Sequence, residues 1–100
     1  MSIDISKLKE DFKKYQFIIK LKNLPFVEKV MLFGSRARGT QQSRSDIDLA
    51  IVCPLATVKE WQQVLTIVQD ADTLLPIDCV RFDSVDEQLK QRILKDGVVL

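Results

Sequence analysis

Two aspartates stand two positions apart at the start of an apolar segment, in the stretch SDIDLAIV of residues 45–52. The pattern predicts a strand over residues 46–53, in which Asp46 and Asp48 share one face because side chains alternate along a strand. The residues expected on the opposite, buried face are Ile47, Leu49 and Ile51. Like charges held this close repel each other, and a hard divalent cation such as Mg²⁺ would neutralise them. Solvation of both carboxylates is the alternative, with Asp46 in a turn.

Gly34 and Ser35 follow another apolar segment, VEKVMLF of residues 27–33, which predicts the preceding strand. Glycine lets the backbone approach a ligand closely, and serine favours the start of a helix, whose first amides can face an anion. We therefore expect a phosphate at the start of a short helix from Ser35 to about Gly39, with the Ser35 hydroxyl as a further donor. The nearby positive charges are Arg36, Arg38 and Arg44. The alternative is a glycine-bounded turn with arginines on the surface.

A third carboxylate, Asp78, lies inside the predicted strand IDCVRF of residues 77–82. An aspartate between apolar strand residues is costly unless it is paired or bound to a metal. Asp78 would then bind the catalytic metal and accept the proton of an attacking hydroxyl, whereas a solvated carboxylate at the sheet edge is the alternative. Three further carboxylates are expected to be solvated: Asp70, Asp72 and Asp83. A phosphate site at one strand's end beside paired carboxylates on the next strand describes a site for a nucleoside triphosphate and its metal.

Composition narrows the chemistry that such a site can use. The chain has no histidine, which excludes Ser-His-Asp triads, Cys-His pairs and the usual zinc sites. Cys53 and Cys79 lie inside apolar segments, so we expect small buried residues rather than a disulfide or a metal pair. Fifteen Lys and Arg against fourteen Asp and Glu leave a net charge of +1, which argues against a nonspecific nucleic-acid coat or a polybasic membrane anchor.

The ends of the chain and its apolar runs bear on localisation. The N-terminal stretch MSIDISKLKEDFKK is charged and lacks the apolar region of a secretory signal. No apolar run approaches the roughly 20 residues of a membrane span. We therefore expect a cytoplasmic protein that does not insert into a membrane.

The elements that would position these residues follow from periodicity and capping signals. All 100 residues are expected to form one domain, 1–100, around one core. Helices are predicted over residues 4–22, with Pro25 as a stop, and over residues 58–73 and 85–95. The signals for the last two helices are the capping boxes Thr57–Glu60 and Ser84–Glu87, and Gly97 as the final C-terminal cap. Helices alternating with three strands predict an α/β fold, a single small mixed sheet with helices packed on it.

The stretch LFGSRARG, followed by SDIDLAIV, resembles the signature of the minimal nucleotidyltransferases of the DNA polymerase β-like nucleotidyltransferase superfamily. That family pairs Gly-Ser and a short Ala-Arg-Gly helix with Ser-Asp-x-Asp-Leu on the next strand and an acidic residue on a later strand. The matching residues are Gly34, Ser35, Ala37, Arg38, Gly39, Ser45, Asp46, Asp48 and Leu49, with Asp78 at the later acidic position. The resemblance covers nearly the whole chain and implies the palm-like fold of these transferases.

The resemblance also implies an activity, which is Mg²⁺-dependent transfer of AMP from ATP with release of pyrophosphate. Gly34, Ser35, Arg38 and Ser45 would bind the nucleotide. Asp46, Asp48 and Asp78 would bind the metals, and Asp78 would serve as ligand or base.

The resemblance further implies a partner. Minimal members resemble half of a two-gene system, whose other half is a small helical protein of the HEPN or substrate-binding type. The expected role is therefore that of an antitoxin that adenylylates a HEPN-type toxin. A non-catalytic antitoxin or subunit that acts by binding a helical partner is the alternative. Transfer to a small molecule such as an aminoglycoside is less favoured because the chain has no room for an acceptor domain. Direct nucleic-acid binding is less favoured because Phe33 is the sole aromatic residue near the arginines.

Overall fold

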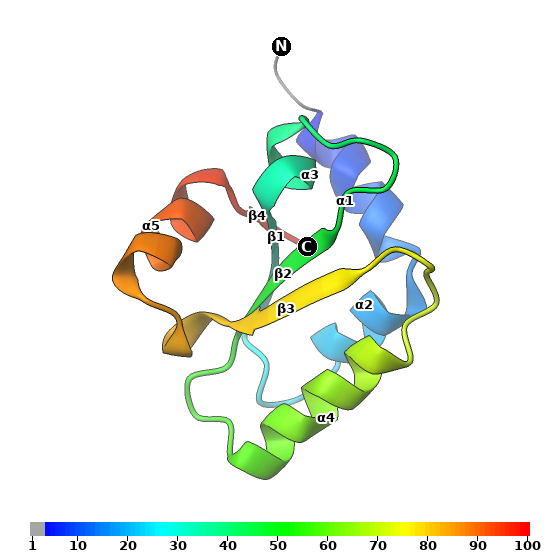
Figure 1. Ribbon diagram of the computed structural model, residues 1–100. Coiled ribbons are helices and arrows are strands. Elements are labelled where there is room, and N and C mark those ends of the chain that lie inside the picture. The colour runs from blue at the N-terminus through cyan, green and yellow to red at the C-terminus, as the bar shows by residue number, and fades with distance from the viewer. Residues whose placement is uncertain (1–3) are drawn as a thin grey trace.

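A four-stranded mixed sheet forms the centre of the computed structural model, which describes residues 4–100 (Figure 1). The strands are β1 (Lys29–Phe33), β2 (Ile47–Val52), β3 (Ile77–Arg81) and β4 (Val98–Val99), in the order β3-β2-β1-β4. β1 runs antiparallel to β2 and β4, whereas β2 and β3 are parallel. The predicted small mixed sheet is therefore confirmed.

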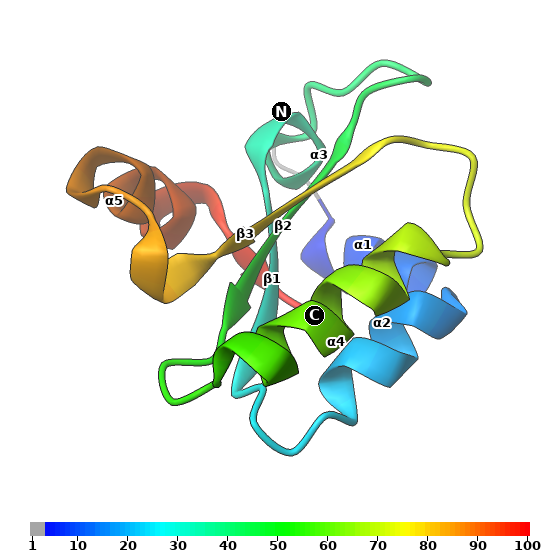
Figure 2. The ribbon, with the colours of Figure 1, turned by 60° about the horizontal axis from the view of Figure 1, so that its bottom comes forward.

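Helices cover the two faces of this sheet unequally. They are α1 (Ile5–Lys13), α2 (Gln16–Lys22), α3 (Gly34–Arg38), α4 (Val58–Gln69) and α5 (Glu87–Asp96), with a 3₁₀ turn η1 at Phe82–Ser84. Figure 2 shows α1, α2 and α4 together on one side of the sheet and α5 on the other side. One face is therefore closed by three helices and the other is covered only in part.

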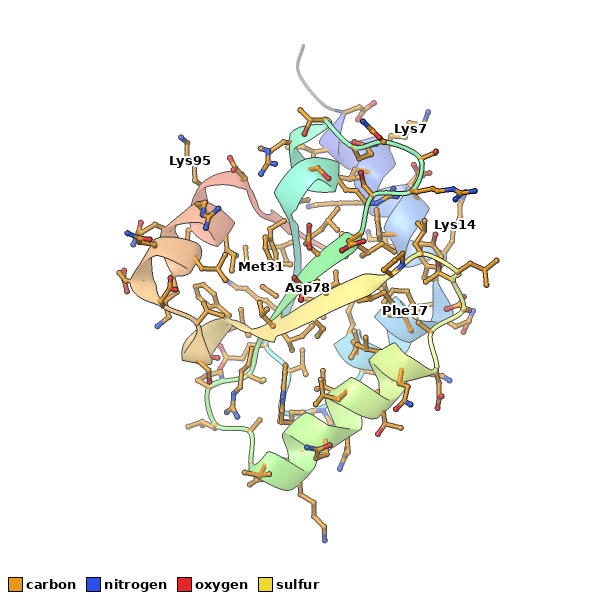
Figure 3. All side chains as sticks on the ribbon, viewed as in Figure 1. Lys7, Lys14, Phe17, Met31, Asp78 and Lys95 are labelled. Atoms are coloured by element: carbon orange, nitrogen blue, oxygen red, sulfur yellow. The ribbon has the colours of Figure 1, made fainter. Side chains whose placement is uncertain are left out.

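The closed face holds the main core. Ile47, Leu49 and Ile51 alternate along β2 and are fully buried on this face, as the sequence predicts. They pack in one cluster with Phe17 of α2, which Figure 3 labels, and Val64 of α4. Because these alternate residues are fixed in the core, the intervening residues of β2, including Asp48, must face the other way.

The second face carries a smaller apolar cluster under α5. Met31 of β1, Ala50 of β2 and Ile93 of α5 are its buried members. Figure 3 shows Met31 beside α5. The polar residues Asp48 and Asp78 occupy the row of this face where β1, β2 and β3 are paired as Phe33, Asp48 and Asp78. The polar part of the face therefore lies directly beside the apolar cluster.

The helix predicted over residues 4–22 is in fact two helices, α1 and α2. The chain is extended at Tyr15, with φ −71° and ψ 129°. The Asp72 carboxylate accepts hydrogen bonds from the first two amides of α2, Gln16 N at 3.0 Å and Phe17 N at 3.1 Å. The prediction that Asp72 is merely solvated is therefore incomplete. Its carboxylate caps a helix that lies 55 residues earlier in the chain.

The remaining helix boundaries follow local capping, with one exception. Thr57 and Glu60 form the predicted capping box of α4, which ends at Gln69 rather than at residue 73. The predicted box of Ser84 with Glu87 is wrong, because Ser84 belongs to the η1 turn. The carboxylate of Asp86 instead accepts a hydrogen bond from Leu89 N at 2.8 Å, and α5 begins at Glu87.

The C-terminal residues add the edge strand β4 beside β1. Gly97 caps α5 as predicted, but its φ of −69° is not left-handed. A Cβ at this position would overlap the Ile93 carbonyl oxygen and approach Met31, so glycine is required here by space. Within residues 4–100, every helix is too short or too polar to cross a lipid bilayer.

Both cysteines are free thiols packed among apolar residues; Cys53 is buried as predicted, whereas Cys79 is only partly buried. Cys53 is fully buried, and burial raises the pKa of its thiol. Burial also raises the pKa of Cys79 to about 12. Burial therefore disfavours the thiolate, which is the reactive form of cysteine, at both positions.

Replacement of Asp72 by alanine is expected to lower the melting temperature by several degrees, because two amides of α2 lose their acceptor. These hydrogen bonds lower the pKa of Asp72, so the stabilisation is present above about pH 4 and is lost as the pH falls through the lowered value. Thermal unfolding at pH 7 and at pH 3 measures both effects. The matched control is Asp70→Ala at the C-terminal cap of α4, which removes a carboxylate with no such bonds. An equal loss in both variants would contradict the capping role.

Candidate active site

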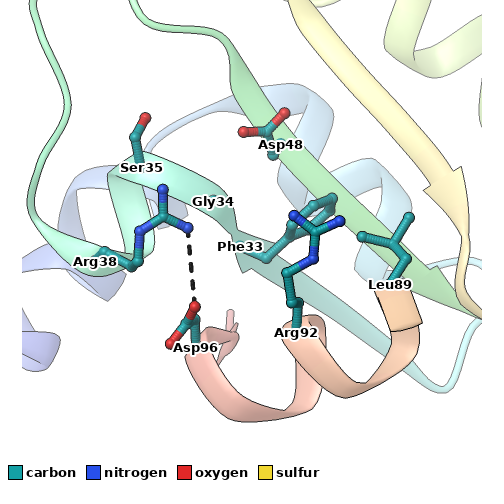
Figure 4. A pocket seen from close by; sticks show the side chains of 8 residues that line it. All are labelled: Phe33, Gly34, Ser35, Arg38, Asp48, Leu89, Arg92 and Asp96. Atoms are coloured by element: carbon teal, nitrogen blue, oxygen red, sulfur yellow. Dashed lines mark ion pairs between the residues drawn. The ribbon is translucent and has the colours of Figure 1, made fainter. Parts of the chain in front are cut away.

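A cavity of about 320 Å³ opens beside the end of β1, between α3 and α5 (Figure 4). Its walls come from four elements, and the lining residues are Phe33, Gly34, Ser35, Arg38, Asp48, Leu89, Arg92 and Asp96. Four residues that the sequence assigns to the nucleotide and metal sites, Gly34, Ser35, Arg38 and Asp48, therefore surround one cavity. Three others, Ser45, Asp46 and Asp78, do not line it.

Gly34 joins β1 to α3 in a conformation that only glycine adopts easily, with φ +72°. A Cβ at this position would overlap the carboxylate of Asp48. The backbone of the turn thus approaches that carboxylate directly. The short helix begins at Gly34, with Phe33 as its N-cap, so Ser35 lies within the first turn and is not the N-cap that the sequence predicts.

Asp48 and Asp78 are direct partners in the parallel register of β2 and β3. Asp48 is half-buried, whereas Asp78 and Asp46 are exposed. Burial raises the pKa of Asp48, and the charges of Asp78 and Asp46 raise it further. Asp46 precedes β2 rather than belonging to it, yet it lies close enough for its charge to act on Asp48. The three predicted carboxylates therefore form one electrostatic group.

The donor set fits a divalent cation that arrives with a nucleotide better than a permanent metal cage. Among residues 4–100, no three acidic, cysteine or histidine side chains converge tightly enough to hold an ion by themselves. Asp48 and Asp78 nevertheless present adjacent carboxylates, and neither has an ion pair within the described part of the chain. Mg²⁺ commonly takes one or two carboxylates and completes its coordination with water and substrate phosphates.

The arginines of the motif have different roles. Arg38 faces the cavity, and its Nη1 lies 3.8 Å from Asp96 Oδ2. Arg36 instead donates to the Ser45 carbonyl oxygen from Nε at 3.2 Å and from Nη2 at 2.8 Å, which holds the loop that leads into β2. Arg44 lies apart, beside Leu74, Leu75 and Pro76. Of the three arginines of the motif, Arg38 is therefore the one that lines the cavity.

Ser45 is also used by the loop. Its hydroxyl oxygen accepts a hydrogen bond from Gln42 N at 2.9 Å, which closes a turn before β2. The prediction that Ser45 binds nucleotide is not reflected in the cavity lining. Its position instead orients the approach of the chain to Asp46 and Asp48.

Sequence reasoning missed the contribution of α5. Leu89, Arg92 and Asp96 line the cavity from this helix. Their spacing of three and four residues places them on one helical face, which is the signal that could have identified them. The sequence could not indicate that this face turns toward Gly34 and Ser35, because that depends on how α5 packs over Met31 and Ala50.

Comparison with known proteins finds relatives among the nucleotidyltransferases. A family model described as polymerase beta, nucleotidyltransferase, matches residues 6–100. Protein adenylyltransferase MntA of Shewanella oneidensis is 35% identical over 86 residues, which cover 80% of this chain and 59% of that protein. The chain thus spans less than two thirds of the length of this relative. A protein of Methanocaldococcus jannaschii, provisionally named a protein adenylyltransferase, is 25% identical over 97 residues and 95% of each chain.

A solved structure is similar as well. A crystal structure of a toxin–antitoxin with AMP-PNP contains a chain that matches with a TM-score of 0.59 and 32% identity. The match covers 83% of this chain and 68% of that chain.

Asp48→Asn is expected to raise the melting temperature at pH 7 by a few degrees when divalent cations are absent. The raised pKa of Asp48 means that its ionised form lowers stability in the folded state. The difference from the wild type should therefore be small near pH 4 and grow as the pH rises through the raised pKa. Thermal unfolding in a chelating buffer measures this, with the exposed Asp11→Asn on α1 as control. A variant less stable than the wild type at pH 7 would contradict the electrostatic account.

Gly34→Ala is expected to lose more stability than Gly39→Ala. Both glycines have a left-handed φ, +72° and +77°, so each substitution costs about 1–3 kcal/mol in backbone strain. At Gly34 the new methyl group would also displace the Asp48 carboxylate, whereas Gly39 does not line the cavity. Urea unfolding compares the two free energies, and equal losses would argue against the close contact with Asp48.

Proposed function

Because the chain belongs to the polymerase β nucleotidyltransferase family, we propose that it transfers AMP from ATP to a hydroxyl group of a partner protein. The two named relatives, both called protein adenylyltransferases, support a protein as the acceptor. The observation that carries the proposal is the placement of Asp48 in register with Asp78 and against the backbone of Gly34. A phosphorus atom placed beside these residues would be within reach of both the proposed phosphate site and the two carboxylates.

In the proposed reaction, the leaving group and the acceptor lie on opposite sides of Asp48. On the cavity side, Ser35 and Arg38 bind the β- and γ-phosphates, with the backbone at Gly34 leaving room for them. On the β3 side, Asp78 is exposed, and the proposed acceptor approaches from this side. The α-phosphate of ATP then lies at Asp48, between the leaving group and the acceptor.

The chemical step is a single displacement at phosphorus. The acceptor hydroxyl oxygen forms a bond to the α-phosphorus while the bond from that phosphorus to the oxygen bridging the β-phosphate breaks. The electron pair of the broken bond leaves with pyrophosphate. Asp78 accepts the hydroxyl proton, so the product is an AMP phosphodiester on the acceptor.

Mg²⁺ is the proposed cofactor, and Asp46, Asp48 and Asp78 are the residues that would hold it. When bound, it would neutralise the combined charge of these carboxylates and the triphosphate. Burial raises the pKa of Asp48, and the negative charges of Asp78 and Asp46 raise it further. Addition of MgCl₂ with a non-hydrolysable ATP analogue should therefore raise the melting temperature of the wild type but not of Asp48→Asn, a readout that is independent of catalysis.

The proposed acceptor is a small helical HEPN-type toxin, for which this chain would act as antitoxin. The sequence resemblance implies such a partner, and the toxin–antitoxin structure with AMP-PNP supports the combination of a nucleotide site with a protein partner. A hydroxyl side chain of the toxin, such as a tyrosine, would be the modified group.

Transfer is tested with ATP labelled at the α-phosphate. The purified chain, Mg²⁺ and the HEPN-type protein encoded beside it should give a labelled partner with the wild type. Asp48→Asn and Asp78→Asn should each reduce the rate at least about a hundredfold, because each removes a charge at the reacting phosphate. Asp11→Asn, which removes an exposed carboxylate on α1, should retain the wild-type rate.

Two outcomes would contradict the proposal. Label that appears equally with Asp48→Asn would reject the carboxylate assignment. A tight complex without transfer, in which Asp46→Asn combined with Asp48→Asn still neutralises the toxin, would instead establish a non-catalytic antitoxin.

A further inference from the structure

Of the two arginines that line the cavity, Arg92 is the one without an ion pair among residues 4–100. It lies on α5 and lines the cavity opposite Ser35, and Figure 4 shows its guanidinium pointing from the helix toward the side of Asp48. Within residues 4–100 it forms neither an ion pair nor a side-chain hydrogen bond, whereas Arg36 is bonded to Ser45 and Arg38 is close to Asp96. Arg92 is therefore free to bind an anion that enters the cavity.

The surroundings of Arg92 favour a polyphosphate as that anion. Arg92 is exposed, and Leu89 and Phe33 provide apolar wall beside it within the cavity. Ser35 and Arg38 supply further donors across a space of about 320 Å³. The planar guanidinium of arginine binds two phosphate oxygens at once, so it suits a group that presents several of them.

We propose that Arg92 binds the pyrophosphate portion of the nucleotide from α5, so that the leaving group is held between α3 and α5. This inference rests on the proposed function and extends it to a residue outside the sequence motif. Arg92 thus discriminates in favour of triphosphates over AMP, because AMP lacks the phosphates that reach α5.

Asp96 gives the same proposal a second, opposite test. Its carboxylate lines the cavity and lies 3.8 Å from Arg38. It therefore competes with the phosphates for the Arg38 guanidinium and adds negative charge to their site. Neutralising Asp96 should therefore tighten polyphosphate binding, whereas neutralising Arg92 should weaken it.

The test is isothermal titration of the full chain with pyrophosphate, tripolyphosphate and AMP in the presence of Mg²⁺. Arg92→Gln should weaken pyrophosphate and tripolyphosphate binding by about 10- to 100-fold, the usual value of a charged hydrogen bond, and leave AMP affinity within about twofold. Arg92→Lys should restore part of the loss. Asp96→Asn should tighten both polyphosphates by about two- to fivefold. The matched control is Lys95→Gln, because Lys95 is an exposed cation of the same helix that points away from the sheet (Figure 3) and should have no effect.

The proposal is overturned if Arg92→Gln binds pyrophosphate like the wild type, or if Lys95→Gln weakens binding equally, which would indicate a general charge effect. Melting temperatures of the variants verify that each is folded. The assay also separates the two levels of inference. Loss of pyrophosphate affinity in a chain that transfers no AMP supports Arg92 and rejects the proposed function. Active transfer with unchanged pyrophosphate affinity in Arg92→Gln rejects Arg92 alone.

Discussion

The parallel pairing of β2 with β3 places the carboxylate of Asp48 beside that of Asp78, and the rest of the site depends on this pairing. Asp48 cannot turn away from Asp78, because the neighbouring residues Ile47 and Leu49 are fully buried on the other face of the sheet. A shift of the register by one residue would place the aspartate in the core and an apolar side chain at the site. The packing of the main core therefore holds the two carboxylates closer together than their mutual repulsion favours.

The unequal covering of the sheet leaves a cavity beside Asp48. A helix packed over the whole of the second face would exclude solvent and ligand from Asp48. In this chain α5 covers only the region of Met31, Ala50 and Ile93. The remaining row is left beside the end of β1, where the chain needs Gly34 because any side chain would meet Asp48. The cavity thus exists because α5 covers only part of the second face and because Gly34 has no Cβ.

The features that the sequence predicted are those encoded locally. Alternation of apolar residues predicted which side of β2 is buried, and the spacing of Thr57 and Glu60 predicted the start of α4. The features that it did not predict depend on residues far apart in the chain. Asp72 determines where α2 begins, and the Asp83 carboxylate accepts a hydrogen bond from Cys53 N at 3.1 Å. Both carboxylates follow helices or strands and carry no local signal that distinguishes them from solvated ones.

The same distinction explains why a short motif contained only part of the site. In the five-residue helix α3, an angle of about 100° per residue sends successive side chains in different directions. Ser35 and Arg38, three residues apart, reach the cavity, Ala37 is buried in the core, and Arg36 holds the loop before β2. One turn of helix is too small to enclose a cavity, so the opposite wall has to come from another element. That element is α5, whose approach to α3 is set by packing over the sheet and not by any residue within the motif.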